Sequence, residues 1–354
     1  DYGEVQDYTV NIIGTLCTGV AKTWDGTSWS PAGMPDITNP VIIDGPFSTG
    51  VDGNDDGNID ACTCQINAVL TVQSGAYLKV KAGIINDVSL LVQHEGSVVQ
   101  VDDDALVINN NIVSITKTTP IMEAQSFMVI GSPMTAETRE GVYASSYIAR
   151  NHSTIDFSPH PLVMSMFPDA DNFADDDGNN WTSHTGLLSP AEGYLVFPQP
   201  DGIASGTFTH NYTTGTLNNG VIIFPVVFNG SQIASPNILS NPYASAIDAD
   251  LFFAEPDNAA IDVLYFWEHL TAAAIGYPGY SDANFSMGDI SLWSEGALGG
   301  VGMAAPNGVE VPTKDIASGQ GFAIKAASAG ITATFNNGMR VTGPNDTYRT
   351  SRTV

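Results

Sequence analysis

Short stretches of alternating apolar and polar residues, separated by Gly, Asn, Asp and Pro, run through the whole chain. Side chains of an extended strand point alternately to its two faces, so each stretch predicts a short β-strand and each interruption a tight turn. The predicted strands span residues 41–43, 69–72, 77–80, 88–92, 98–101, 106–108, 194–197, 221–227, 263–267, 321–325 and 331–335. The pattern therefore predicts an all-β fold.

A single helix is expected, at residues 245–254. Ser245 can cap its first turn, Asp248 follows three residues later, and the apolar run that begins at Leu251 supplies the buried face. Pro256 cannot continue a helix and is expected to end it.

The region 23–117 contains an internal repeat. Gly75, Leu78 and Val80 match Gly96, Val99 and Val101 at a spacing of 21 residues. Each unit consists of a strand, a tight Gly turn and another strand. Units of this length suit either a stacked β-solenoid or a sandwich of hairpins, and the repeat is too short to decide between them.

A larger repeat covers the rest of the chain. Residues 192–196 (EGYLV) match 320–324 (QGFAI), and residues 131–134 (GSPM) match 240–243 (SNPY) upstream of them. We interpret this as a duplicated β-sandwich module of the jelly-roll type, with one copy at 118–227 and the other at 228–345. Residues 1–22 then form a separate strand segment, and 346–354 form a tail.

Acidic residues dominate the charge: 38 Asp and Glu stand against 11 Lys and Arg, which gives a net charge of −27. A polyanion repels nucleic acid and anionic membranes, so neither is an expected partner. No Lys or Arg occurs between Arg150 and Lys314. Either the surface is adapted for solubility in salt, or bound cations neutralise some of the carboxylates. No apolar run is long enough for a transmembrane helix.

Two acidic segments are candidate calcium sites. In the first, oxygen-bearing side chains alternate as in a calcium loop, a glycine supplies the turn, and Asn58 offers its carbonyl; the proposed ligands are Asp52, Asn54, Asp56, Asn58 and Asp60. Thr63 stands where an EF-hand has its bidentate Glu, so the expected site is a weaker, calcium-stabilised turn. The second, less regular segment contains Asp169, Asp171, Asp175 and Asp177. In each case the alternative is a solvated acidic loop.

Three cysteines, Cys17, Cys62 and Cys64, permit one disulfide, between Cys17 and either Cys62 or Cys64. Their spacing matches no zinc site. No nucleophile elbow, zinc-protease helix or P-loop is present, so no enzyme is expected. Trp24 and Trp29 are candidates for stacking on sugars, whereas the alternating Tyr265, Phe266 and Trp267 are expected to fill a sandwich core.

Several motifs resemble one family of proteins. Residues 241–248 (NPYASAID) resemble the "GNPYPSAID" element of large Bacteroidota surface proteins exported by the type IX secretion system. Residues 264–267 (LYFW), 319–322 (GQGF) and 335–341 (FNNGMRV) follow in the order of that family's "YFW…GQGF…FNNSMR" series. Residues 3–8 (GEVQDY) resemble the "GEVEDY" strand that closes another small β domain of these proteins. A C-terminal sorting domain does not follow, so both ends are expected to be cut.

The resemblance implies export and display outside the cell, and it carries no catalytic residues with it. We therefore expect an extracellular structural or adhesive protein that associates with itself or with other surface proteins. In a fibre, the N-terminal strand would pair with the neighbouring subunit through its alternating residues, Val5, Tyr8, Val10 and Ile12. The alternative is a glycan-binding module of a larger secreted degradative enzyme.

Overall fold

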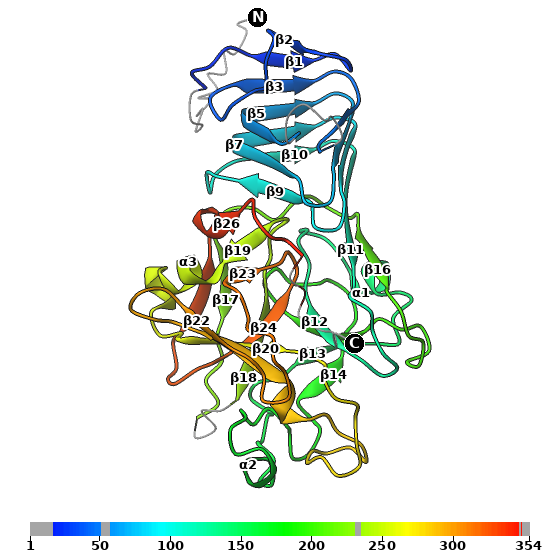
Figure 1. The fold of residues 1–354 in the computed structure, drawn as a ribbon, viewed down its shortest axis with the longest axis vertical. Coiled ribbons are helices and arrows are strands. Elements are labelled where there is room, and N and C mark those ends of the chain that lie inside the picture. The colour runs from blue at the N-terminus through cyan, green and yellow to red at the C-terminus, as the bar shows by residue number, and fades with distance from the viewer. Residues whose placement is uncertain (1–16, 51–56, 231–234, 347, 349–354) are drawn as a thin grey trace, which may run out of the picture.

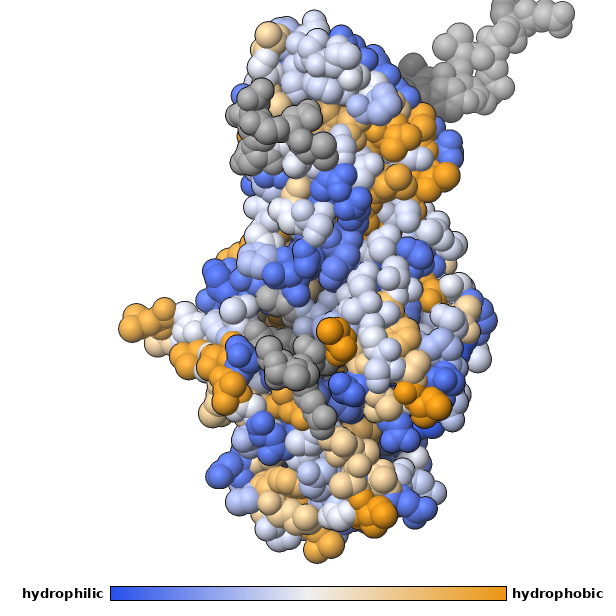
Figure 2. All heavy atoms as spheres, turned by 45° about the vertical axis from the view of Figure 1, so that its right-hand side comes forward, coloured by the Kyte–Doolittle hydropathy of each residue, from blue (hydrophilic) through white to orange (hydrophobic). Residues whose placement is uncertain are grey.

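The computed structural model describes residues 17–50, 57–230, 235–346 and 348. It is nearly all β, with 37% of the chain in strands and 7% in helices, as the sequence predicts. A narrow column of stacked strands stands on a wider body (Figure 1). Hydrophilic and hydrophobic side chains are mixed over the face shown in Figure 2, with hydrophilic ones gathered near the junction of column and body.

The column is a β-solenoid-like stretch of about four turns, which decides between the two alternatives left open by the short repeat. Its strands form two parallel stacks. One stack contains β1 (Lys22–Trp24), β3 (Pro40–Ile43), β5 (Ile59–Ile66), β7 (Tyr77–Asn86), β9 (Ser97–Gln100) and β10 (Val107–Asn109). The other contains β4 (Phe47–Ser48), β6 (Val69–Val72), β8 (Ser89–Val92) and β11 (Ile112–Thr118). The short strand β2 (Trp29–Ser30) pairs antiparallel with β1 at the outer end.

Alternation along these strands builds the interior of the column. Val41, Cys64 and Ile84 lie side by side in adjacent strands and are all buried. The second stack forms the same kind of ladder from Leu70, Leu90 and Val113. Each turn therefore adds its inward-facing residues to one continuous core.

The spacing predicted for the repeat was wrong by one residue. Leu78 pairs with Val98 and not with Val99, so the repeat spacing here is 20 residues. Glu95, and not Gly96, takes the left-handed backbone position of Gly75, with φ of 66° against 75°. A match of Gly75 with Gly96 gives a spacing of 21 residues, whereas in the structure the turn at Gly75 is equivalent to the turn at Glu95.

The body contains two half-modules with the same strand order. In the first, the sheet order is β12 (Met128–Ile130), β15 (Tyr194–Phe197), β13 (Ile148–His152), β14 (Trp181–Ser183). In the second it is β18 (Pro236–Ser240), β24 (Gly321–Lys325), β20 (Val263–Trp267), β21 (Ile290–Ser294), β22 (Val301–Met303). An antiparallel pair flanks each sheet: β11 with β16 (Thr209–Tyr212), and β17 (Ile222–Pro225) with β25 (Thr332–Phe335). The two half-modules thus share both the strand order and the flanking pair, as expected for two copies of one module.

The two half-modules differ in how they are joined to the column. The strand β11 belongs to the solenoid stack and also pairs with β16, and one hydrophobic cluster runs from Val41 through to Leu217. The second half-module has its own cluster, around Phe252 and Phe322. A small sheet contains β23 (Asp315–Ile316), β19 (Ala246–Asp248) and β26 (Arg340–Val341). The helical elements are α1 (Arg139–Val142), α2 (Val163–Met166), α3 (Ala249–Phe253), η1 (Pro256–Asn258), η2 (Met287–Asp289) and η3 (Asn337–Met339).

The predicted helix at 245–254 is shorter than expected and starts later. Asp248, and not Ser245, caps α3, because its carboxylate accepts a 2.9 Å hydrogen bond from the backbone of Asp250. Ser245 is buried just before the strand β19. The helix ends before Pro256, which opens the 3-10 turn η1 instead.

The C-terminal motif FNNGMR fastens the body to the column. The buried guanidinium of Arg340 donates to the carbonyl of Val98 at 2.6 Å and to the side chain of Gln100 at 3.2 Å, both in β9. It also lies over the ring of Tyr243, 4.7 Å from the centroid, in the NPYASAID motif. Burial lowers the pKa of Arg340 to about 10, so the side chain remains charged at neutral pH. Two of the family-like motifs, NPYASAID and FNNGMR, thus meet at this joint.

We predict that Arg340→Ala lowers the free energy of unfolding by roughly 3 kcal/mol, because it leaves several buried acceptors without a donor. Thermal melting should show the loss as a lower Tm. Arg139→Ala is the matched control, since the Arg139 side chain makes one weak 3.4 Å bond to the carbonyl of Ser146. Equal Tm values for the two variants would contradict the assigned role of Arg340.

The disulfide joins Cys17 to Cys62, which leaves Cys64 as the free thiol among the three. Cys64 stands inside the solenoid ladder, whereas Cys62 lies outside the hydrophobic cluster. A register irregularity between Ala61 and Thr63 interrupts the alternation that would otherwise place both cysteines on one face. Burial raises the pKa of the Cys64 thiol to about 12.

We expect the native, non-reduced protein to resist alkylation, because Cys64 is buried and protonated. After unfolding without reductant, a single thiol should react, and peptide mass spectrometry should place the label on Cys64. Cys64→Ala should remove this labelling altogether. Rapid labelling of the folded protein, or a label on Cys62, would contradict the pairing.

Candidate functional site

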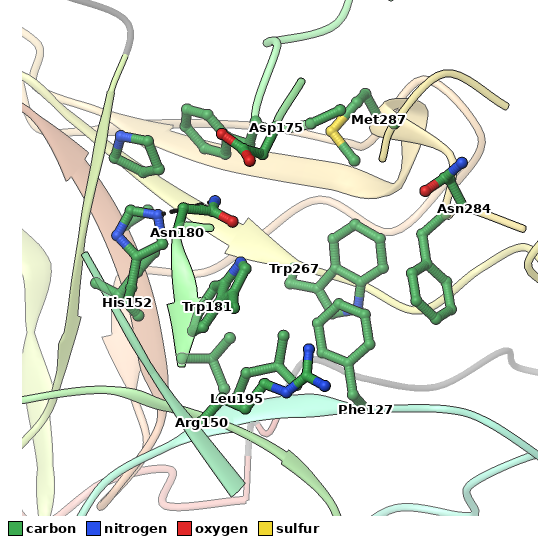
Figure 3. Close-up of a pocket in the computed structure, with 18 of the residues that line it drawn as sticks. Phe127, Arg150, His152, Asp175, Asn180, Trp181, Leu195, Trp267, Asn284 and Met287 are labelled. Atoms are coloured by element: carbon green, nitrogen blue, oxygen red, sulfur yellow. Dashed lines mark hydrogen bonds between the residues drawn. The ribbon is translucent and has the colours of Figure 1, made fainter. Parts of the chain in front are cut away.

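A cavity of about 540 Å³ lies between the two half-modules. Each sheet buries one face in its own core, with Met128, Tyr194 and Val196 on one side and Phe266 and Phe322 on the other. The opposite faces of β12, β13, β14 and β15 and of β18, β20 and β24 line the cavity (Figure 3). Alternation along β13 therefore directs Ile148, Arg150 and His152 into it.

The repeated glycines bring the two sheets together. Gly193 donates to the carbonyl of Ile238 at 3.1 Å, and Gly131 donates to the carbonyl of Gly319 at 2.9 Å, so the half-modules hydrogen-bond across their interface. A Cβ on Gly193 would lie 2.5 Å from the carbonyl oxygen of Leu239, and one on Gly321 would lie 2.3 Å from a methyl of Val129. The glycine in each copy of the EGYLV and QGFAI segments is thus needed for this approach.

Aromatic side chains form much of the cavity wall. The rings of Trp267 and Phe127 stack with centroids 4.7 Å apart and an interplanar angle of 13°. Phe285 packs edge-on against Phe127 at 4.9 Å. Across the cavity, Trp181 packs against His152 at 4.8 Å. Figure 3 shows Trp181 and Trp267 facing the same space from the two half-modules.

Polar groups stand among these rings. The His152 ring shares a 3.3 Å contact with the amide of Asn180, and burial lowers the pKa of His152 to about 4, so the ring is neutral at neutral pH. Asp175 is the one carboxylate among the lining residues, and it is buried. Its oxygens accept backbone hydrogen bonds from Ser158 at 2.8 Å and from Gly178 at 2.5 Å.

Two buried polar atoms at the cavity have no partner among the residues that the structure describes. They are the indole nitrogen of Trp267 and Nδ1 of His152. Buried polar groups are paired in the great majority of cases, and leaving one unpaired costs free energy. A ligand that supplies the missing partners would recover that cost, which makes the cavity the strongest candidate site in the described chain.

Two loops contribute residues to the wall of the cavity. One contains α2 and precedes β14, and the other precedes β21. Val163 and Met287 belong to one small hydrophobic cluster, and the rings of Phe167 and Tyr277 meet at 5.6 Å. Gly178 and Tyr280 also approach closely here.

The structure does not bring the four carboxylates of the second candidate calcium segment together. Asp171 forms an ion pair with Lys325, and the carboxylate of Asp175 accepts a hydrogen bond from the backbone of Gly178. Asp169 and Asp177 are exposed. Within the described ranges, no three His, Cys, Asp or Glu side chains gather into a metal-binding group. Calcium binding stays a prediction.

The first candidate segment lies only partly in the described chain. Asp52, Asn54 and Asp56 fall outside it, as do the proposed strand-exchange residues Val5, Tyr8, Val10 and Ile12. Of the remaining ligands, Asn58 accepts the backbone N–H of Tyr77 at 2.8 Å, and Asp60 lies 3.2 Å from the Tyr77 hydroxyl.

Trp24 and Trp29 lie at the outer end of the column, away from the cavity. Their rings pack on each other at 5.4 Å and on Phe47, and the Trp24 indole donates to the carbonyl of Pro46 at 2.9 Å. These contacts hold both indoles against the outer end of the column. The tryptophans that face the cavity are Trp181, which the sequence did not single out, and Trp267, which was expected in a sandwich core. Of that expected core run, Phe266 does pack in the core of the second half-module. The alternation Ile148-Arg150-His152 is the signal that could have pointed to the cavity face.

Residues 17–354 match a family described as a domain of unknown function (DUF8693), and the chain belongs to that family. No curated protein and no solved structure matches the chain. No helix among the described residues is long and apolar enough to cross a membrane.

The contact between the two loops can be tested at Gly178, which has φ of +74° and where a Cβ would lie 2.1 Å from the Tyr280 ring. We predict that Gly178→Ala lowers the free energy of unfolding by about 2 kcal/mol or more, through backbone strain and the displaced ring. Gly186→Ala isolates the strain alone, because its φ is +81° and no atom lies within 4 Å of the added Cβ. Identical losses of Tm in the two variants would show that the Tyr280 contact is not formed.

Proposed function

We propose that the chain is an extracellular adhesive protein that binds a saccharide in the cavity between its half-modules. The observation that supports this most directly is the pair of unpartnered polar atoms, on Trp267 and His152, in a cavity walled by aromatic rings. Aromatic faces suit the apolar faces of sugar rings, while scattered polar groups suit their hydroxyls.

The architecture fits display of such a site. The column and the cavity are separated along the length of the molecule, because the cavity is lined from β13, β14, β18 and β20, which lie in the body below the column (Figure 1). The column would then act as a stiff spacer. The Cys17–Cys62 disulfide is compatible with an oxidising location outside the cell.

The residues that line the cavity favour binding of a saccharide without its hydrolysis. Hydrolysis of glycosides ordinarily requires two carboxyl groups that face each other across the scissile bond. Asp175 is the one acidic residue among those that line the cavity, and its oxygens are occupied by backbone donors. Elsewhere, Asp248 caps α3, and Asp250 accepts from the Trp293 indole at 3.0 Å.

A glycan array, followed by isothermal titration of the hits, tests the proposal. We expect Trp267→Ala and Trp181→Ala each to weaken binding by about tenfold or more, because each removes one aromatic wall. Trp24→Ala is the control and should leave affinity unchanged. An array without hits, or equal effects of all three substitutions, would contradict the proposal.

A further inference from the structure

Arg150 is the only Lys or Arg among the residues that line the cavity. Its position in β13 places the side chain on the cavity face, and Figure 3 shows the guanidinium directed into the space below Trp267 and Trp181. In the sequence, Arg150 also precedes the long segment, up to Lys314, that has no basic residue. The cavity therefore has one fixed positive charge in a chain of net charge −27.

The guanidinium of Arg150 makes no hydrogen bond or ion pair within the described part of the chain, although it is partly buried. Two other cations of the body are matched differently. Lys325 forms an ion pair with Asp171 and lies 4.5 Å from the centroid of the Tyr265 ring. Lys314 pairs with Asp248 at 2.5 Å. A cation withdrawn from water without a partner is costly, so Arg150 is poised for an anionic group from outside the chain.

The duplication shows that this charge is specific to one half of the cavity. Arg150 pairs with Leu195, and Tyr265 pairs with Ala323, at the same place in the repeated EGYLV and QGFAI segments. Arg150 and Tyr265 are thus equivalent positions, and two residues further along each strand stand His152 and Trp267. One copy of the module supplies the polar groups, and the other supplies the aromatic wall opposite them.

We infer that the ligand is an acidic saccharide, a uronic acid oligomer, and that Arg150 anchors its carboxylate while the rings of Trp267 and Trp181 hold the sugar. This inference rests on the saccharide binding proposed above. The planar guanidinium offers parallel donors that match a carboxylate in a bidentate pair, which a neutral hydroxyl cannot match in strength.

The carboxylate of Asp175 and the negative net charge of the chain both repel an acidic ligand. Neither prevents a direct contact between its carboxylate and Arg150. Asp175 also faces the cavity, but backbone donors from Ser158 and Gly178 compensate its charge locally. The net charge of −27 acts at longer range. Salt screens that repulsion beyond roughly 8 Å at physiological ionic strength, whereas a direct contact with Arg150 is screened much less.

Titration calorimetry in physiological salt tests the inference. The probes are oligomers of galacturonic, mannuronic and glucuronic acid, each paired with its own methyl ester, which keeps the sugar and removes the charge. We expect at least one acid to bind about 10- to 100-fold more tightly than its ester. Arg150→Gln should abolish that preference while changing the affinity for the ester by less than about twofold.

Arg150→Lys keeps the charge without the planar fork, so it should retain only part of the preference. Arg139→Gln, outside the cavity, should change nothing, and the Tm of each variant reports whether it is folded. Equal binding of acid and ester, or a preference that survives Arg150→Gln, overturns the role of Arg150 and leaves saccharide binding standing. Equally tight binding of a sulfated galactan overturns the choice of a carboxylate. Failure of every acidic and neutral saccharide contradicts both proposals.

Discussion

The buried guanidinium of Arg340 is the contact that holds the second half-module against the column. It donates to Val98 and Gln100 in the last solenoid turn and also to Asn337 and Asn219 of the body, at 3.2 and 3.3 Å. Around it, Asn337 donates to the carbonyl of Asp102 at 2.8 Å, and Ala244 accepts from Val98 at 2.8 Å. A charge buried in this way is stable only while all its acceptors stay in place, so the joint fixes the direction in which the column leaves the body.

The second constraint is the close approach of the two half-modules. Their sheets have the same order of strands, and the glycine of each repeated segment lies where a side chain would collide with the other copy. Because each sheet already buries one face in its own core, the remaining faces are left opposite each other. The cavity is a consequence of the duplication, and divergence of the two copies has made its walls chemically different.

The sequence predicts the parts of this fold that depend on local periodicity. Alternation locates the strands, and the repeats indicate stacked units in the column and an equivalent pair of segments in the body. The errors arise where long-range contacts decide. A backbone hydrogen bond to Asp248 sets the start of α3, and the pairing of whole turns sets the spacing between Leu78 and Val98. The choice of Cys62 over Cys64 depends on an irregularity between two strands, which no spacing rule reveals.

The candidate site was harder to find from the sequence because its residues come from separate strands and loops. Arg150, Trp181 and Trp267 are far apart in the chain; Trp267 ends the LYFW motif, and the other two belong to no motif. Only the sheet order and the interface between copies bring them to one cavity. Other motifs that resemble known surface proteins have structural roles. NPYASAID and FNNGMR form the joint, and the EGYLV and QGFAI segments form the interface between the half-modules.

The most direct test of this account is a crystal structure of the protein with a bound uronic acid oligosaccharide. We expect density for a sugar ring between Trp267 and Trp181, with its carboxylate on the guanidinium of Arg150. Density at the outer end of the column, around Trp24 and Trp29, or a cavity closed by its own side chains in the presence of a bound oligosaccharide, would contradict it.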